Sequence, residues 1–154
     1  MSKELRQHLI DQLDSDHAHI RFADAVKDFP AALRGKRPEN GPHSPWELLE
    51  HLRIALWDIL EFTRDGKHVS PEFPSGYWPA SAEPPSADAW DKSVAQYEAD
   101  LRAFAELVKD ESADLFARIP HGTGQTPLRE VLVAIDHNAY HVGQLLMVRR
   151  VLGG

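Results

Sequence analysis

Two histidines, His137 and His141, stand four residues apart in the last quarter of the chain. Successive residues of an α-helix are rotated by about 100°, so positions i and i+4 share a face and both imidazoles can reach one point in space. Neutral imidazole nitrogens are common ligands of divalent metals. The pair therefore has metal-ligand spacing, although imidazoles with hydrogen-bond partners are also tolerated in helical cores.

A third histidine, His51, is expected near the middle of another helix, and Asp58 follows two turns later on the same side. Three protein ligands leave a metal position open for water or substrate, which is the arrangement of catalytic rather than structural sites. Asp58 is then a candidate catalytic residue, as proton acceptor, with His19 as the alternative. The structural interpretations also stand: His51 as a core or surface histidine, and Asp58 as a solvated or capping carboxylate.

The chain contains no cysteine. This excludes disulfide scaffolds, thiolate zinc sites and cysteine nucleophiles, and it leaves histidine, aspartate and glutamate as the strong metal ligands. The expected cofactor is a divalent metal ion, with zinc or nickel first in order, but a three-histidine set also accepts copper and iron.

The prolines divide the sequence into four long proline-free windows, residues 1–29, 46–70, 86–119 and 128–154. A proline inside a helix costs about 3 kcal/mol, so long helices belong in such windows. Each window carries apolar residues at spacings of three and four, and no segment alternates as a strand would. At 154 residues the chain is expected to form a single domain, 1–154, of the all-α class with four helices.

Local signals predict where these helices begin and break. Ser44 followed by Pro45 and Glu47 predicts a capped start for the second helix, and Thr126 with Pro127 predicts the same for the last. Asp14, Ser15 and Asp16 are weak helix formers and predict a break or kink in the first window. Residues 66–85, with five prolines and the pair Tyr77-Trp78, are expected to be a packed loop beside a pocket.

Charge and hydropathy restrict the partners. Seventeen Lys and Arg stand against twenty-four Asp and Glu, for a net charge of −7, which disfavours a nucleic-acid partner. The longest purely apolar run is 131–135, and the N-terminus has no apolar signal region. The sequence predicts a soluble, cytoplasmic protein that acts on a small molecule and binds neither nucleic acid nor membrane.

The last window has two stripes that need cover. One carries the histidine pair with Gln144, and the other is aliphatic, made of Leu128, Leu132, Ile135, Val142 and Leu146. A monomeric bundle needs only one covered face per helix, so this pattern predicts a homodimer. The remaining histidines are expected outside the metal site, His8 and His68 at the surface, His43 and His121 in loops, and His17 and His19 beside the break or lining a pocket.

The segments SPWELLEH, GQTPLRE and DHNAYHVGQ, in this order, resemble the DinB-like superfamily of metalloenzymes. The resemblance implies a four-helix bundle with one crossed connection, often dimeric. It also implies a divalent metal held by His51, His137 and His141. Several related groups act as metal-dependent transferases or isomerases that use small cellular thiols.

Two functions follow as hypotheses. The first is a divalent-metal-dependent enzyme that acts on a small molecule as a thiol-type transferase, an isomerase or a hydrolase. The alternative is a non-catalytic module of a stress response that binds a metal or a small ligand. An open metal position with a titratable group beside it favours the enzyme, and a closed site favours the module.

Overall fold

The computed structural model describes residues 1–14 and 17–154, and the all-α prediction is confirmed. This part of the chain contains no strand. Its α-helices are α1 (Lys3–Leu13), α2 (Phe22–Val26), α3 (Pro45–Arg64), α4 (Ala89–Lys109) and α5 (Pro127–Val151), joined by the short 3₁₀ helices η1 (Ala31–Leu33) and η2 (Ser75–Tyr77).

The first proline-free window holds two helices instead of one, which makes five α-helices in the described residues where four were predicted. Helix α1 ends at Leu13, directly before the predicted break, and α2 begins at Phe22. Of the residues that predicted the break, Ser15 and Asp16 lie outside the described part of the chain. The other three windows each carry one long helix.

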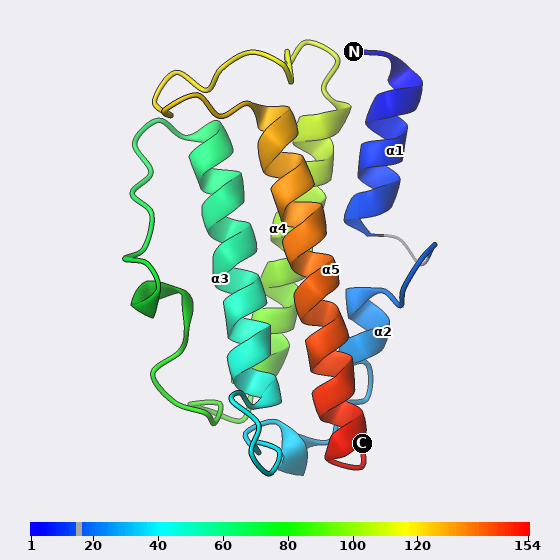
Figure 1. The fold of residues 1–154 in the computed structure, drawn as a ribbon, viewed down its shortest axis with the longest axis vertical. Coiled ribbons are helices and arrows are strands. Elements are labelled where there is room, and N and C mark those ends of the chain that lie inside the picture. The colour runs from blue at the N-terminus through cyan, green and yellow to red at the C-terminus, as the bar shows by residue number, and fades with distance from the viewer. Residues whose placement is uncertain (15–16) are drawn as a thin grey trace.

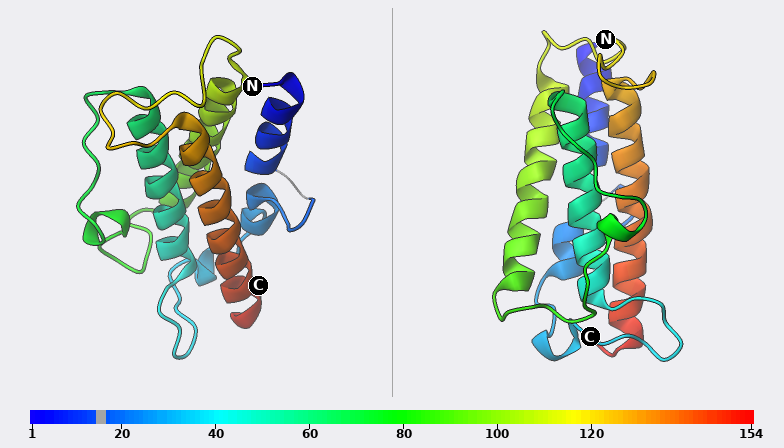
Figure 2. Two further views of the ribbon diagram at one scale, coloured as in Figure 1. Left: turned by 45° about the horizontal axis from the view of Figure 1, so that its top comes forward. Right: turned by 90° about the vertical axis from the view of Figure 1, so that its left-hand side faces the viewer.

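The four long helices stand in a ring in the order α3, α4, α1, α5 (Figures 1 and 2). Helix α3 packs against α4 and α5, and α1 packs against the same two helices from the other side. Helices α3 and α4 run in the same direction, so the segment between them, residues 65–88, has to return along the length of the bundle. On its way η2 packs against α3. This path carries the proline-rich loop past the middle of α3.

Both predicted helix caps are present. The Ser44 side chain accepts a hydrogen bond from the Glu47 amide at 3.2 Å, and the Ser44 amide donates to the Glu47 carboxylate at 2.7 Å. Burial raises the pKa of Glu47, but hydrogen bonds from Arg37 and from Ser44 outweigh it and leave the pKa below its ordinary value. Thr126 caps α5 by accepting from the Arg129 amide at 3.2 Å. These caps fix where the two histidine-bearing helices begin.

One contiguous apolar core joins the helices. It includes one face of α4, whose fully or nearly buried members are Trp90, Tyr97, Leu101, Phe104 and Val108. On α5 the bundle itself does not cover the aliphatic stripe at Leu132, which is 50% exposed. Because α5 packs against both α3 and α1, its buried arc includes Val131, Ala134 and Leu145 together with Val142 of the stripe. None of the described helices combines the length and apolar character that crossing a membrane requires.

Candidate metal centre

The fold brings the three predicted metal ligands together. His51 comes from α3, and His137 and His141 come from the neighbouring α5. One ligand nitrogen from each lies within 4.8 Å of the other two. The Nε2 atom of His51 is 3.1 Å from Nε2 of His137 and 3.1 Å from Nε2 of His141. The i,i+4 pair on one helix thus faces a single histidine on the next.

The spacing of these nitrogens fits a divalent metal. Zinc–imidazole bonds of about 2.0–2.1 Å in a tetrahedral site place neighbouring ligand nitrogens about 3.3 Å apart. The two Nε2 separations that involve His51, each 3.1 Å, need only a few tenths of an ångström of movement to reach that value. The cluster therefore has the donor type and the dimensions of a three-histidine metal site.

Hydrogen bonds fix two of the rings in the tautomer that a metal requires. Nδ1 of His51 lies 2.9 Å from the backbone carbonyl oxygen of Tyr77, and Nδ1 of His141 lies 2.7 Å from the side-chain oxygen of Gln144. Oxygens of these groups only accept, so each Nδ1 carries the hydrogen and each Nε2 keeps its lone pair for the cluster. Nδ1 of His137 is buried with no hydrogen-bond partner.

The three imidazoles are held neutral. Burial, as the main cause, and the neighbouring histidines together lower the pKa of His137 and of His141 to about 4. Burial also lowers the pKa of His51, against a smaller opposite effect of its bond to Tyr77. At neutral pH the lone pairs that a metal would use are therefore free of protons.

Aromatic rings wall one side of the cluster. The indole of Trp78 stacks on the His51 ring with centroids 4.0 Å apart and planes 3° apart, and it also stacks with His43 at 4.1 Å and 13°. His43 lies in a loop, as predicted, and its Nδ1 is buried without a partner. The sequence indicated only that the Tyr77-Trp78 pair packs down. It gave no sign that the pair packs on a candidate ligand.

Asp58 lies on α3 outside the three-histidine cluster and is buried. Its Oδ2 accepts a hydrogen bond from the Tyr77 hydroxyl at 2.6 Å, and its Oδ1 lies 2.7 Å from Nε2 of His68. The prediction that His68 is a surface residue is wrong, since its side chain is only 8% exposed. It contacts the Asp58 carboxylate, and its ring is nearly perpendicular to that of Trp57, with centroids 5.0 Å apart. A catalytic role of Asp58 stays a prediction.

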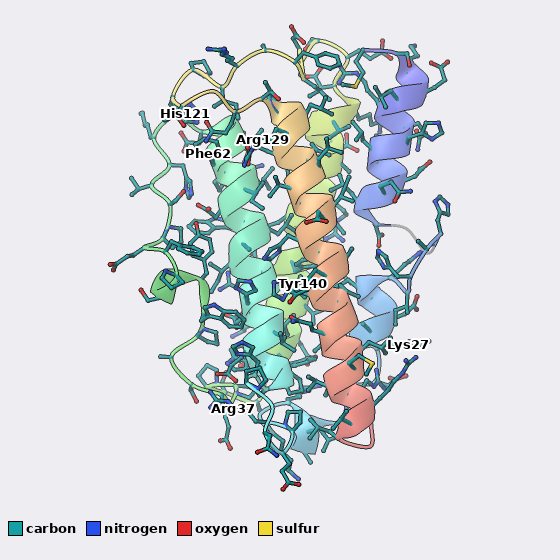
Figure 3. The ribbon with its side chains drawn as sticks, viewed as in Figure 1. Lys27, Arg37, Phe62, His121, Arg129 and Tyr140 are labelled. Atoms are coloured by element: carbon teal, nitrogen blue, oxygen red, sulfur yellow. The ribbon has the colours of Figure 1, made fainter. Side chains whose placement is uncertain are left out.

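The other histidines lie away from the cluster. His19 lines a cavity of about 20 Å³ together with Tyr97 and Asn138, so it lines a pocket but is not brought to the three imidazoles. His8 is exposed, as predicted. His121 lies in the loop before α5, where its Nε2 is 2.7 Å from the carbonyl oxygen of Phe62 (Figure 3).

A surface groove of about 690 Å³ runs along α5 and reaches the cluster. Its lining residues are Thr126, Leu128, Arg129, Leu132, Val133, Asp136, His137, Tyr140 and His141. Arg129 marks the end of the groove near the start of α5, and Tyr140 marks its other end (Figure 3). Asp136 and Tyr140 escaped the sequence analysis, although each directly precedes a histidine of the pair. The groove leads from the surface to the α5 side of the three-histidine cluster.

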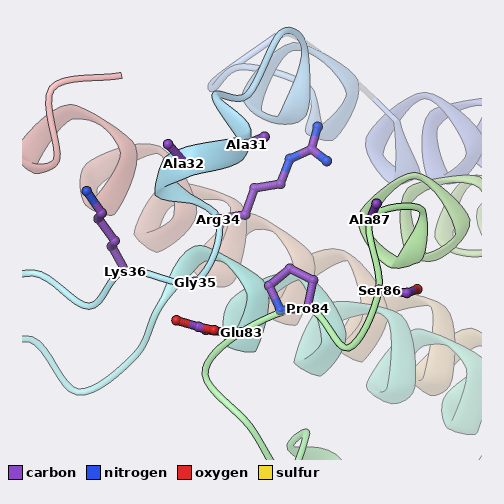
Figure 4. Close-up of a pocket in the computed structure, with 9 residues that line it drawn as sticks. All are labelled: Ala31, Ala32, Arg34, Gly35, Lys36, Glu83, Pro84, Ser86 and Ala87. Carbon is purple, nitrogen blue, oxygen red and sulfur yellow. The ribbon is translucent and has the colours of Figure 1, made fainter.

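A second cavity, of about 370 Å³, lies between η1 and the segment before α4 (Figure 4). Its cationic side chains, Arg34 and Lys36, point in different directions. The Arg34 guanidinium lies 5.0 Å from the ring centroid of Trp90 and 3.7 Å from the Asp91 carboxylate. These side chains do not converge on a point that a ligand could occupy.

Helices that hold three neutral imidazoles around one point define a helical protein with a candidate metal centre. The family model of the DinB superfamily matches residues 12–145, which is most of the chain, and the protein belongs to this superfamily. Searches among curated proteins and among solved structures returned no match.

Proposed function

We propose that the protein binds one divalent metal ion through His51, His137 and His141 and uses it in a reaction on a small molecule. The observation that carries this proposal is the convergence of the three imidazoles, whose nitrogens lie within 4.8 Å of one another. The donor set contains only imidazoles, which suits zinc and nickel. Neutral rings, with pKa values lowered by burial, add to the fit.

A bound divalent metal would supply Lewis acidity to a substrate atom in this site. The chain's own residues supply access and orientation. The groove along α5 offers the apolar surface of Leu132 and Tyr140 to a substrate and ends at the two α5 histidines. Two carboxylates are candidates for accepting a proton, Asp58 from the sequence analysis and Asp136 from the groove lining. A thiol-type transferase, an isomerase and a hydrolase all need these same parts.

A non-catalytic module that binds a metal or small ligand is the second candidate function. It is favoured by the hydrogen bonds of Asp58, because both of its carboxylate oxygens are already engaged. Asp136, which lines the groove, favours the enzyme. Turnover in a screen of thiol-transfer, isomerase and hydrolase substrates separates the two.

The first experiment is elemental analysis of protein purified without an affinity tag and equilibrated with zinc. One zinc per chain is expected for the wild type, and far less for His137→Ala. The matched control is His121→Ala, a loop histidine away from the cluster, which should keep full occupancy. Wild-type protein that binds no zinc or nickel, or a His137→Ala variant that binds as well as the control, would contradict the proposal.

We also propose a homodimer formed through α5. Four large apolar side chains of this helix are exposed, by between 50% and 66%, and they recur along one face: Leu132, Tyr140, Met147 and Val151. An exposed apolar stripe of this length is typical of a protein–protein contact. The same stripe on a second copy would cover it, and because Leu132 and Tyr140 also line the groove, the second copy would form the outer wall of the groove.

A further inference from the structure

We propose that Asp58 is a positioning residue: it fixes the loop of residues 65–88 so that this loop holds the His51 ring in its metal-binding tautomer and orientation. The inference rests on the proposed metal function. It goes beyond that function by assigning a second set of residues, outside the ligands, to the same site. Three contacts carry it: Asp58 with Tyr77, Tyr77 with His51, and Trp78 with His51.

In the first contact, the Asp58 carboxylate binds two side chains of the loop. Its side chain is 11% exposed, and its two oxygens receive the Tyr77 hydroxyl at 2.6 Å and Nε2 of His68 at 2.7 Å. Burial, and then the contact with Asp58, raises the pKa of Tyr77 to about 12, so its hydroxyl stays a donor. Hydrogen bonds to a charged acceptor are among the stronger ones in proteins. One buried carboxylate therefore fastens the loop at two points.

The second contact uses both ends of Tyr77. Its hydroxyl binds Asp58, and its backbone carbonyl accepts the hydrogen bond from Nδ1 of His51 at 2.9 Å. Asp58 and His51 are seven residues apart on α3, or about 10 Å along the helix axis. Tyr77 thus spans two successive turns of one helix face. Its carbonyl cannot leave His51 without disturbing the bond that its hydroxyl makes to Asp58.

The third contact is the stacking of the next residue. Trp78 lies flat on the His51 ring, with centroids 4.0 Å apart and planes 3° apart. The Tyr77 carbonyl fixes the edge of the imidazole, and the Trp78 indole fixes its face. Metal-bound histidines commonly donate their second N–H to a carbonyl, which sets the tautomer and ring orientation. Here two consecutive loop residues supply both restraints, and Asp58 holds the loop that carries them.

The geometry favours this role over that of a proton acceptor. A catalytic base needs an oxygen free to reach the substrate. Asp58 has both oxygens engaged by the loop, and it does not line the groove beside His137 and His141. The two roles predict different consequences, because a positioning residue alters metal binding and a base does not.

The test compares Asp58→Ala, Tyr77→Phe and the double variant with a matched control, Asp100→Asn. Asp100 is also a buried carboxylate, but it lies on α4 and bonds to Gln96. Zinc affinity is measured by competition with a chelator, helix content by circular dichroism, and the His51 tautomer by nitrogen-15 NMR of the apo protein. Tyr77→Phe removes one hydroxyl only and keeps the test valid if Asp58→Ala fails to fold.

The wild type and Asp100→Asn should show His51 protonated on Nδ1 alone. In Asp58→Ala and Tyr77→Phe, zinc affinity should fall about 10- to 100-fold, the range for losing the hydrogen bonds that orient a metal ligand. Helix content should be kept, and both His51 tautomers should be populated. The double variant should lose no more than the larger single loss, since both changes break one link. Additive losses, or an equal loss in Asp100→Asn, would indicate general destabilisation and overturn the inference.

Two further outcomes bear on the assignment. Unchanged zinc affinity and an unchanged tautomer in Tyr77→Phe and Asp58→Ala would refute the positioning role, and lost turnover with full affinity in Asp58→Ala would make it a base instead. Failure of the wild type to bind zinc or nickel would refute the proposed function. The tautomer of His51 in the apo variants would still test the hold of Asp58 on the loop.

Discussion

Zinc affinity should fall by no more than about tenfold when the pH is lowered from 7.5 to 5.5, because the folded protein resists protonation of its own ligands. Protons and metal compete for the same imidazole lone pairs. The outcome therefore depends on the pKa values of the three histidines in the folded apo protein. Burial lowers the pKa of His137 and of His141 to about 4 and also lowers that of His51.

The magnitude follows from the neutral fraction of each ring. A histidine with the unperturbed pKa of about 6.5 goes from about 90% neutral at pH 7.5 to about 10% at pH 5.5, which is a tenfold loss per ligand. Three such ligands would lose about a thousandfold. Rings with a pKa of about 4, as for His137 and His141, stay almost entirely neutral at pH 5.5. Only His51 remains, and its contribution is at most about tenfold.

The assay is calorimetric titration of the apo protein with zinc at pH 5.5, repeated in buffers of different ionisation enthalpy to count released protons. Unperturbed ligands would release nearly three protons per zinc at this pH, roughly 2.7 from the fractions above. The structure predicts less than about one. Release of two or more protons, or an affinity loss of a hundredfold or greater from pH 7.5, would refute the account of buried, neutral ligands.

The same pKa values predict how the stability of the apo protein depends on pH. Below about pH 6.5 the histidines of the unfolded chain bind protons, whereas the folded rings of His137 and His141 do not. The free energy of unfolding, measured by urea titration at each pH, should therefore decline from about pH 6.5 toward pH 4. Phe104→Ala, at a fully buried position, should cost about 3–5 kcal/mol in the same assay. Ser44→Ala, which removes the cap of α3, should cost about 1 kcal/mol. Sedimentation at micromolar concentration should give a dimer, and Tyr140→Glu on the exposed face of α5 should give monomer; a monomeric wild type would remove the homodimer.

The sequence alone was enough to predict the features that depend only on residues close together in the chain. Ser44 and Thr126 cap their helices because capping needs only the next three residues, and both caps are present. The pairing of His137 with His141 follows from helix geometry alone. His51 is different, because its position opposite this pair depends on how α3 packs against α5. The resemblance to a family supplied that information, and the spacing of His51 did not.

The parts that escaped prediction depend on the path of a loop and on helix rotation. His68 was expected at the surface, and nothing within the proline-rich segment reveals that it turns back to the buried Asp58 carboxylate. The contacts of Tyr77 and Trp78 with His51 could not be predicted for the same reason, since they depend on where the folded loop places η2 against α3. Leu132 was placed by its spacing in the aliphatic stripe that needs cover. The packing of α5 against α3 and α1 leaves the Leu132 side chain half exposed.

X-ray absorption spectroscopy of the zinc-loaded protein tests the central claim most directly, because it counts the ligands of the bound metal. The account predicts three imidazole nitrogens at about 2.0–2.1 Å and at least one further light-atom ligand from solvent, the signature of an open site. The imidazole count should drop in His141→Ala and stay at three in the loop control His121→Ala. Two or fewer imidazoles in the wild type, or a fourth protein ligand that closes the site, would contradict a three-histidine centre open to substrate.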